Sequence, residues 1–427
     1  MFPEYFWRLQ IILVNLHGVM RNHTFMQRQF RYIDLFSGCG GLSLGLHLSG
    51  WKGVFAIEKS PFAFATLKYN LIENRNHFDW PSWLPITNLD INDVLAKFAP
   101  ELKKLRGKID LVVGGPPCQG FSMAGKRIEN DIRNQLVFSY VKFIKLVRPS
   151  IVLFENVKGF TFAFNRQSNK DAIPYSDIVI NELQQLGYNV TPHIIDFSNY
   201  GIPQRRKRFI LIGIKNKDSK CFQELLTKYA PIYLQEKGLN QFTSLSEAIS
   251  DLLRNNGEVP TPDRVGFYSG IYGPVKSNFQ KLMRKGVDIS AIPDSHSFAH
   301  HNTNTIELFS NLIAKYPTKG KRINSQERAL WNIHKRGLTI LDKNNITPTL
   351  TSHPDDYIHY CEPRILTVRE YARIQTFPDW YKFKMKYTTG GKMRKFEVPR
   401  YTQIGNAVPP LFAELAGHIL IKLLQNG

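Results

Sequence analysis

The stretch from Tyr32 to Leu48, YIDLFSGCGGLSLGLHL, decides the fold class of this 427-residue chain. Its apolar run over Tyr32 to Phe36 predicts a buried strand, Ser37 to Gly41 form a glycine-rich turn, and the spacing of apolar residues from Leu42 to Leu48 predicts a helix. A further apolar strand is expected over Gly53 to Ile57. This order of strand, turn, helix and strand is typical of a parallel sheet.

The same alternation continues along the chain. Strands are expected over 109–113, 151–154, 190–195 and 209–214, and helices over 135–147 and 176–186. The fold class is therefore predicted as α/β, with a doubly wound, mostly parallel sheet covered by helices on both faces.

The regular rhythm is lost between about 215 and 363, where turns are rich in Gly, Pro and Asn and aromatic residues stand among basic ones. A second, smaller and irregular domain is expected there. A helix returns over Thr367 to Gln375, with Thr367 as N-cap and Glu370 completing a capping box.

The charge of the chain is unusual. Its formal net charge is +21 and its pI is about 9.7. Such an excess of Lys and Arg implies a polyanionic partner, with nucleic acid first and a membrane surface second.

The cysteines argue for a reducing compartment. Four of them lie far apart, without a Cys-x-x-Cys pair or a nearby pair of histidines at ligand spacing, at Cys39, Cys118, Cys221 and Cys361. No metal site and no disulfide framework is predicted, and a cytoplasmic location fits best. The apolar stretch Ile11 to Val14 is too short for a membrane span, and Met20 or Met26 could equally be the start.

The glycine turn is a candidate ligand site. Glycines let a ligand approach the backbone, and the start of the following helix offers unpaired amides. Glu58 ends the next expected strand, where a carboxylate can accept hydrogen bonds from ribose hydroxyls, and Asp90 could receive an adenine amino group. An adenosine-bearing ligand is expected, either a dinucleotide or S-adenosylmethionine; the alternative is a tight turn with acids that only cap helices.

A second turn carries the candidate nucleophile. GGPPCQGFS, from Gly114 to Ser122, follows the apolar run 109–113. Two prolines stiffen the backbone before Cys118, and glycines on both sides give access to it, which suits a reactive thiol. The other three cysteines are expected to be structural.

These motifs together resemble the cytosine-C5 DNA methyltransferases, of the prokaryotic type II restriction-modification kind. The matching pieces follow the family's order: DLFSGCGG at 34–41, GPPCQGFS at 115–122, ENV at 155–157, QRRKR at 204–208, RILTVRE at 364–370 and QIGNAVPP at 403–410. The resemblance covers nearly everything from Arg31 to the C-terminus except about 215–345.

The resemblance implies which residues are catalytic. The thiolate of Cys118 adds to C6 of cytosine, Glu155 acts at N3, and Arg208 steadies the base at O2, with Arg206 among the catalytic residues. It also implies S-adenosylmethionine as cofactor. The expected cofactor-binding residues are Phe36, Gly38, Gly40, Glu58, Lys59, Asp90, Ile91, Pro116, Leu136, Asn406 and Val408.

The implied substrate is a cytosine rotated out of duplex DNA. DNA contacts are expected from Gln119, Ser122, Arg133 and Gln204. The implied organisation is an accessory extension over 1–27, a catalytic S-adenosylmethionine-binding domain over 28–216 and 398–427, and a small domain with the target recognition region over 217–397.

The function expected is therefore methyl transfer to C5 of cytosine in a specific DNA sequence, protecting DNA from a cognate restriction endonuclease. A monomer in the prokaryotic cytoplasm or nucleoid, without a membrane partner, is expected. Three alternatives stay open: an RNA cytosine methyltransferase, a relative that only binds DNA, and, from the glycine turn alone, a nicotinamide oxidoreductase.

Overall fold

The computed structural model describes residues 28–117, 135–162, 173–391, 393 and 396–425. Arg31–Gly427 form one compact unit. Four predicted site residues, Cys118, Gln119, Ser122 and Arg133, lie outside the described residues.

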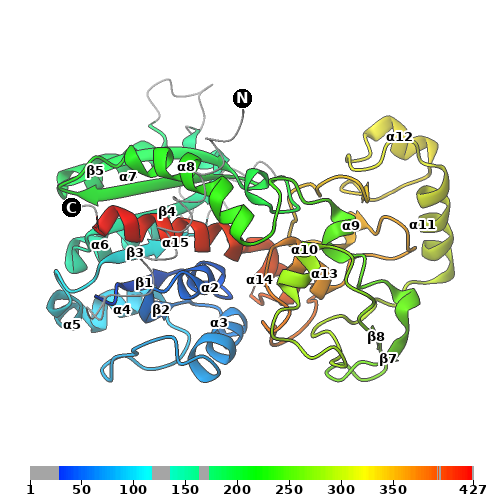
Figure 1. The fold of residues 1–427 in the computed structure, drawn as a ribbon, viewed down its shortest axis with the longest axis horizontal. Coiled ribbons are helices and arrows are strands. Elements are labelled where there is room, and N and C mark those ends of the chain that lie inside the picture. The colour runs from blue at the N-terminus through cyan, green and yellow to red at the C-terminus, as the bar shows by residue number, and fades with distance from the viewer. Residues whose placement is uncertain (1–27, 118–134, 163–172, 392, 394–395, 426–427) are drawn as a thin grey trace, which may run out of the picture. The chain divides into compact units, whose positions relative to one another are not determined.

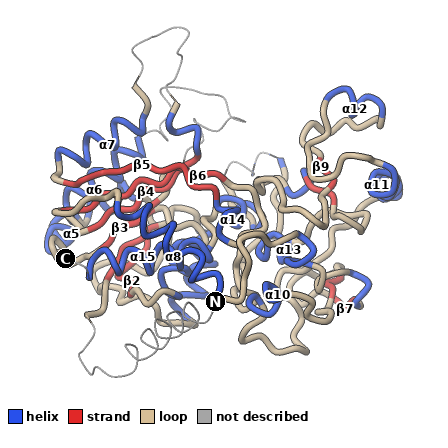
Figure 2. Tube along the Cα trace, turned by 45° about the horizontal axis from the view of Figure 1, so that its top comes forward, coloured by secondary structure: helices blue, strands red, loops and turns tan. Residues whose placement is uncertain are grey.

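The first half of this unit is built on a six-stranded sheet (Figures 1 and 2). Its strands, in the spatial order β2-β1-β3-β4-β6-β5, are β2 (Lys52–Ile57), β1 (Arg31–Leu35), β3 (Leu111–Gly114), β4 (Ile151–Val157), β6 (Lys207–Lys215) and β5 (Tyr188–Asp196). The first four strands run parallel, and β6 is antiparallel to both of its neighbours. The predicted α/β fold is confirmed.

The strand order explains why the sheet is doubly wound. The chain moves from β1 outward to β2, then returns past β1 to β3 and β4. Because parallel crossovers are right-handed, reversing the direction of travel places the connecting helices on opposite faces. One group of helices comprises α4 (Ile91–Lys97), α5 (Ala99–Lys104), α6 (Gln135–Val147) and α7 (Tyr175–Gln185); the other comprises α2 (Gly41–Leu48), α8 (Cys221–Glu236) and α15 (Pro410–Gln425).

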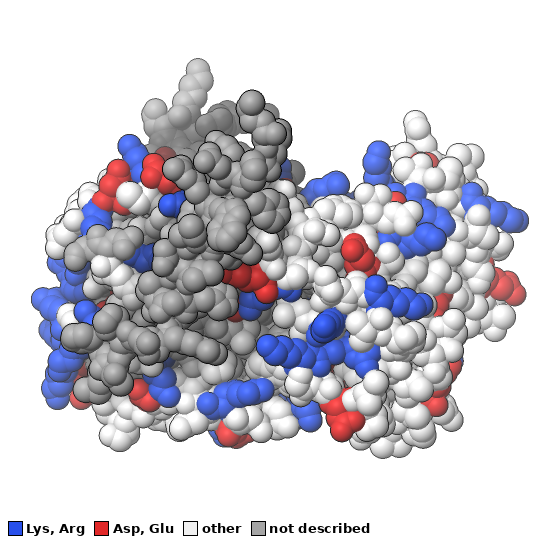
Figure 3. Space-filling view, viewed as in Figure 1, with Lys and Arg blue, Asp and Glu red and all other residues white. Residues whose placement is uncertain are grey.

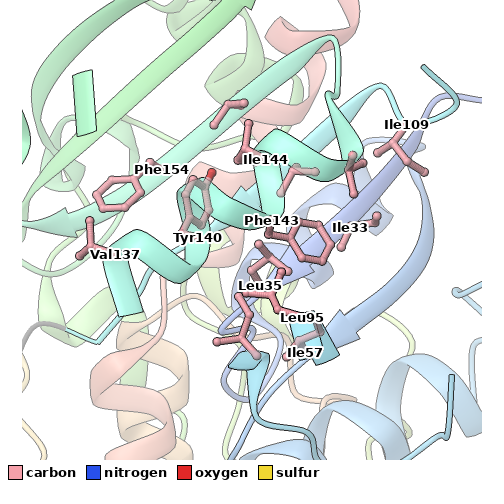
Figure 4. Close-up of a cluster of buried hydrophobic side chains, with 14 of the residues drawn as sticks. Ile33, Leu35, Ile57, Leu95, Ile109, Val137, Tyr140, Phe143, Ile144 and Phe154 are labelled. Carbon is pink, nitrogen blue, oxygen red and sulfur yellow. The ribbon is translucent and has the colours of Figure 1, made fainter. Parts of the chain in front are cut away.

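A hydrophobic core joins α6 to the sheet (Figure 4). Tyr140 and Phe143 of α6 are fully buried against strand residues that include Leu35 and Phe154. Strand residues covered on both faces form continuous apolar runs, which is why these strands could be recognised in the sequence.

The register brings the functional motifs to one edge. Leu35 of β1 pairs with both Ile57 of β2 and Gly114 of β3, so the three strands end side by side. Phe154 of β4 pairs with the same Gly114. The residues that follow these strands therefore meet at the carboxyl edge of the sheet, where ligands bind in open α/β folds.

The end of the chain completes this region. A Cβ atom added to Gly45 of α2 would lie 2.3 Å from Cβ of Ala413 in α15, so the two helices touch through their backbones. The indole of Trp51 donates a hydrogen bond to the carbonyl of Gly417 at 3.0 Å. The segment Arg400–Gln425 is apolar and long enough to span a membrane, but 72% of its most apolar 18-residue window is buried, as in the core of a folded protein.

The remaining part consists of short elements, as the sequence predicted. They are α9 (Leu245–Ile249), α10 (Asn278–Met283), α11 (Thr303–Lys315), α12 (Ser325–Leu330), α13 (Val368–Ile374), α14 (Arg400–Asn406), β7 (Glu258–Pro260), β8 (Tyr268–Gly270), β9 (Thr339–Ile340) and β10 (Tyr357–Ile358). Near β2 lie α3 (Pro61–Leu67) and a π-helical turn (Lys68–Glu73), and short 3₁₀ turns occupy Lys158–Thr161, Phe197–Tyr200, Arg254–Asn256 and Pro354–Asp356.

Helix α13 holds this part together. The predicted capping box is confirmed: the Glu370 amide donates to Thr367 Oγ1 at 3.2 Å, and the Thr367 amide donates to Glu370 Oε2 at 2.7 Å. Arg373 is fully buried and bonds both Asp251 and Asp379. Since a buried charge is tolerated only when it is paired, this cluster fixes α13 against its neighbours.

The limits of the two predicted domains stay a prediction. Helix α8 falls inside the range 217–397, yet the Tyr233 hydroxyl donates to Glu414 Oε2 of α15 at 2.8 Å. Residues 221–236 therefore pack on a helix of the predicted catalytic domain.

Candidate active site

The glycine turn follows β1 at the carboxyl edge of the sheet. Phe36, Gly38 and Gly40 have positive φ angles of 58°, 56° and 89°. A Cβ atom on Gly41 would lie 2.4 Å from the carbonyl oxygen of Val408. The structure therefore brings the predicted residues of the first motif into contact with the last motif.

Glu58 closes the turn from the side of β2. Its Oε2 accepts a hydrogen bond from the Gly38 amide at 2.9 Å, and its Oε1 accepts one from the Ser60 amide at 2.6 Å. Burial raises the pKa of Glu58, although these backbone donors oppose the shift. A carboxylate at this place can accept hydrogen bonds from a ribose.

Asp90 and Lys59 lie beyond Glu58. Asp90 caps α4, accepting a hydrogen bond from the Asn92 amide at 2.8 Å, and Lys59 Nζ lies 2.9 Å from Asp90 Oδ2. Burial opposes a lower pKa for Asp90, but the hydrogen bonds from Lys59 and the Asn92 amide, together with the charge of Lys59, lower the pKa. The Leu89 amide bonds the Glu58 carbonyl at 2.8 Å, which joins the two acids, and Ile91 is buried behind them.

Two buried polar atoms at the glycine turn bear on the predicted adenosine-bearing ligand. Within the described part of the chain, Asp34 Oδ1 and Ser37 Oγ are buried and have no hydrogen-bond partner. Burial raises the pKa of Asp34 to about 7, against the hydrogen bond from Ser43. Because buried polar atoms normally have partners, two such atoms in and before the glycine turn fit a polar ligand.

Three further residues that the sequence predicts for the cofactor site lie on other elements. Pro116 is buried after β3, Leu136 lies in the first turn of α6, and Asn406 ends α14 just before Val408. They belong to three segments that are far apart in the sequence.

The turn that leads to Cys118 lies against Glu155. A Cβ atom on Gly115 would lie 2.7 Å from Glu155 Oε2, so the turn approaches the carboxyl group closely. The side chain of Asn156 donates to the Pro116 carbonyl at 3.2 Å and holds the turn from below. The acid and the prolines that precede the thiol are therefore neighbours.

Arg208 is the partner of Glu155. Its Nε lies 3.0 Å from Glu155 Oε1, and the two side chains are only 12% and 13% exposed. Burial raises the pKa of Glu155, while Arg208 and Arg206 oppose the shift. A carboxyl group whose protonated form persists above its usual pH range suits proton donation to a substrate.

Gln204 and Arg206 lie together beside the last motif. Both are buried: Arg206 donates to the carbonyl of Gly405 at 2.9 Å, and Gln204 Oε1 accepts from the Leu350 amide at 3.0 Å. Their side chains join the last motif to the segment beside it instead of facing the reaction edge. The DNA contact expected of Gln204 and the catalytic role expected of Arg206 stay predictions.

Gly115→Ala should lower methyl transfer while the fold persists. The added Cβ would push Glu155 Oε2 away and stretch its bond to Arg208. We expect a lower kcat with little change in Tm, measured by methyl transfer and thermal unfolding. Gly213→Ala in β6 is the control, because its Cβ would meet its nearest neighbour at 3.5 Å, an ordinary contact. Equal kcat values for both variants would contradict the close approach.

Comparison with known proteins decides the family. The family model described as C-5 cytosine-specific DNA methylase matches residues 30–422. The chain belongs to this family. The type II methyltransferase M.DdeI of Desulfomicrobium norvegicum is 32% identical over 402 residues, covering 92% of this chain and 89% of that protein. M.XorII of Xanthomonas oryzae pv. oryzae is 29% identical over 411 residues, covering 92% and 85%.

A solved structure shares the fold. It is described as a DNA modification methyltransferase encoded within an E. coli prophage; its TM-score is 0.63 at 24% identity, covering 93% of this chain and all of that chain. This methylase is therefore a DNA (cytosine-5) methyltransferase, as the motifs predicted, and its family uses S-adenosylmethionine as methyl donor. The RNA and non-catalytic alternatives are not favoured.

Proposed function

We propose that this methylase modifies cytosine in one specific duplex sequence and protects that sequence from a cognate restriction endonuclease. The observation that carries the proposal is the Glu155–Arg208 pair, placed against Gly115 at the start of the turn that leads to Cys118. The similar proteins named type II methyltransferases support the link to restriction and modification.

Each residue of this site has a chemical task. Cytosine C5 is a weak nucleophile, so the Cys118 thiolate first adds to C6 and electron density moves toward N3 and C5. Protonated Glu155 stabilises the charge at N3, and Arg208 keeps Glu155 in place and faces the O2 edge of the base. After methyl transfer a base removes the C5 proton, and the thiolate leaves from C6.

The glycine turn is the proposed donor site. S-adenosylmethionine supplies the methyl group when it is bound. Glu58 would hold its ribose, Asp90, Lys59 and Ile91 its adenine end, and Phe36 would stack on the purine. Gly38, Gly40, Pro116, Leu136, Asn406 and Val408 would line the rest.

The target base must leave the helix to reach this edge. We propose that Gln119, Ser122 and Arg133 contact the DNA around the flipped cytosine, and that Gln204 supports the strand that carries Arg208. The protein is proposed to act as a monomer, in a prokaryotic cytoplasm or nucleoid, without a membrane partner.

Methylation mapping tests the function. Genomic DNA from cells expressing the chain should show 5-methylcytosine at one recurring sequence, detected by bisulfite sequencing. A purified protein that transfers no methyl group to any duplex, or that methylates transfer RNA in preference to duplex DNA, would refute the proposal.

DNA binding should depend steeply on salt. A protein that neutralises several phosphates releases counterions, and a net charge of +21 makes many such contacts available. For six to ten contacts, affinity should fall about 10³–10⁵-fold between about 50 and 200 mM salt. Fluorescence anisotropy with a labelled duplex measures how the affinity changes with salt concentration. An affinity independent of salt would contradict binding through phosphate contacts.

A further inference from the structure

The hydroxyl of Tyr381 reaches the glycine turn from a distant part of the chain. It donates a hydrogen bond to the carbonyl of Cys39 at 2.5 Å, although 342 positions separate the two residues. A Cβ atom on Gly40 would lie 2.8 Å from the same hydroxyl, so the turn and the phenol approach each other closely. Tyr381 lies outside every motif that carries the family resemblance.

This hydrogen bond fixes the orientation of one peptide group in the turn. On its other side, the same peptide is held by the Gly40 amide, which donates to the Ser37 carbonyl at 2.9 Å. Gly38 and Gly40, which flank Cys39, have positive φ angles of 56° and 89°. Because glycine populates many backbone conformations, a peptide between two glycines can rotate unless a neighbour holds it. The Tyr381 hydroxyl therefore helps to restrict the turn to one conformation.

Tyr381 is itself held in place by its surroundings. Its side chain is fully buried, and its ring packs beside Phe377 and Phe383, with ring centroids 5.1 and 5.7 Å away. Arg369 of α13 donates to the Tyr381 carbonyl at 2.8 Å, and the same guanidinium nitrogen lies 3.2 Å from Asp294 Oδ2. The hydroxyl is therefore a preorganised donor, which loses little entropy when it holds the turn.

The residues after Tyr381 are bonded to α3 and to the π-helical turn that follows it. The side chain of Asn70 donates to the Lys382 carbonyl at 2.7 Å and accepts from the Lys382 amide at 2.9 Å. The Lys384 amide donates to Thr66 Oγ1 at 2.9 Å. The segment that carries Tyr381 is thus anchored to α13 on one side and to α3 on the other, so the phenol cannot easily move away from the glycine turn.

We infer that Tyr381 is a positioning residue for the methyl donor: its hydroxyl holds the peptide between Cys39 and Gly40 in the conformation that binds S-adenosylmethionine. This rests on the proposed donor site at the glycine turn, which it extends by a residue outside the motifs. Tyr381 acts through the backbone of the turn. Without its hydroxyl, the turn would have to be ordered when the donor binds, and that cost would weaken donor binding.

Tyr381→Phe tests this role, because it removes the hydroxyl and keeps the packed ring. We expect the Kd for S-adenosylmethionine, measured by isothermal titration calorimetry without DNA, to rise about 5- to 50-fold, since a buried carbonyl loses its donor. The KM for S-adenosylmethionine should rise in parallel, while kcat at a saturating donor concentration stays within about twofold of the parent value.

The KM for DNA separates this role from a general defect. Lys and Arg side chains are spread over the face of the molecule drawn in Figure 3, whereas Tyr381 is fully buried. Tyr381→Phe therefore leaves the charged surface as it is, and the KM for duplex DNA should stay close to that of the parent.

Tyr188→Phe is the matched control. The Tyr188 hydroxyl is also buried and also donates to a backbone carbonyl, that of Pro149, at 2.7 Å. Pro149 precedes β4 and therefore lies toward the amino ends of the parallel strands, whereas the glycine turn follows the carboxyl end of β1. Tyr188→Phe should lower Tm about as much as Tyr381→Phe does, but it should leave the Kd for S-adenosylmethionine unchanged.

Each other outcome overturns the positioning role or the proposal beneath it. Equal Kd values in the parent and in Tyr381→Phe would overturn the role of the hydroxyl and leave the methyltransferase function standing. An equal rise in Tyr188→Phe, a parallel loss of kcat and of DNA affinity, or a Tyr381→Phe protein that no longer unfolds cooperatively would show only a structural role. A parent protein that binds no S-adenosylmethionine would refute the proposed donor site itself.

Discussion

Cys118→Ala should lower methyl transfer to DNA by at least ~10³-fold, because no other group in the proposed site can add to C6 of cytosine. Without that addition C5 stays a weak nucleophile and the methyl donor is not attacked. Transfer of labelled methyl groups from S-adenosylmethionine to duplex DNA measures the loss. Cys118→Ser should behave similarly, since a hydroxyl is a far poorer nucleophile than a thiolate.

A fluorinated substrate makes the covalent step visible. With fluorine at C5 there is no proton to remove, so the Cys118 adduct on a 5-fluorocytosine duplex should persist and migrate as a protein–DNA complex in a denaturing gel. Cys221→Ser is the matched control, because Cys221 is a free, half-buried thiol at the start of α8. Trapping that survives in Cys118→Ala, or is lost in Cys221→Ser, would reject Cys118 as the nucleophile.

Glu155→Gln should lower kcat by about 10²–10⁴-fold while cofactor binding is retained. The amide keeps the shape of the carboxyl group but cannot transfer a proton to N3. Single-turnover methyl transfer and the Kd for S-adenosylmethionine separate the two effects. Glu414→Gln is the control for burial, since Glu414, near the start of α15, is also a buried acid and pairs with Lys237 at the end of α8.

The pH dependence of methyl transfer tests independently whether Glu155 donates a proton. Burial raises the pKa of this carboxyl group, so the protonated form persists to higher pH than for an exposed glutamate. The contribution of this proton to activity should fall as the pH rises through the raised pKa, while the need for the Cys118 thiolate limits activity at low pH. This alkaline fall should disappear in Glu155→Gln, and a profile identical to that of the parent would remove Glu155 from the proton transfer.

The regular half of the fold could be predicted because its signals are local. The strand expected over 151–154 is a continuous apolar run that lies inside β4, and α6 occupies the predicted range 135–147. The capping box at Thr367 was equally readable, since it depends on two residues three positions apart.

The contacts within the site were less predictable because they join distant segments. Glu155, Arg208 and Gly115 are brought together by pairing of β4 with β3 and with an antiparallel β6. Gln204 and Arg206 show the limit: the resemblance implied a DNA contact for Gln204 and a catalytic role for Arg206, but it could not show that their buried side chains bond to residues 350 and 405–407.

The contact of α15 with α2 has a consequence for synthesis of the protein. Val408 packs against the glycine turn, and Ala413 packs against α2. The ribosome therefore synthesises the first motif long before the C-terminal residues that complete its packing. A nascent polypeptide should therefore be inert until translation has almost finished. A stop codon that removes α15 should abolish activity as fully as loss of the thiol, although every reacting residue is still present.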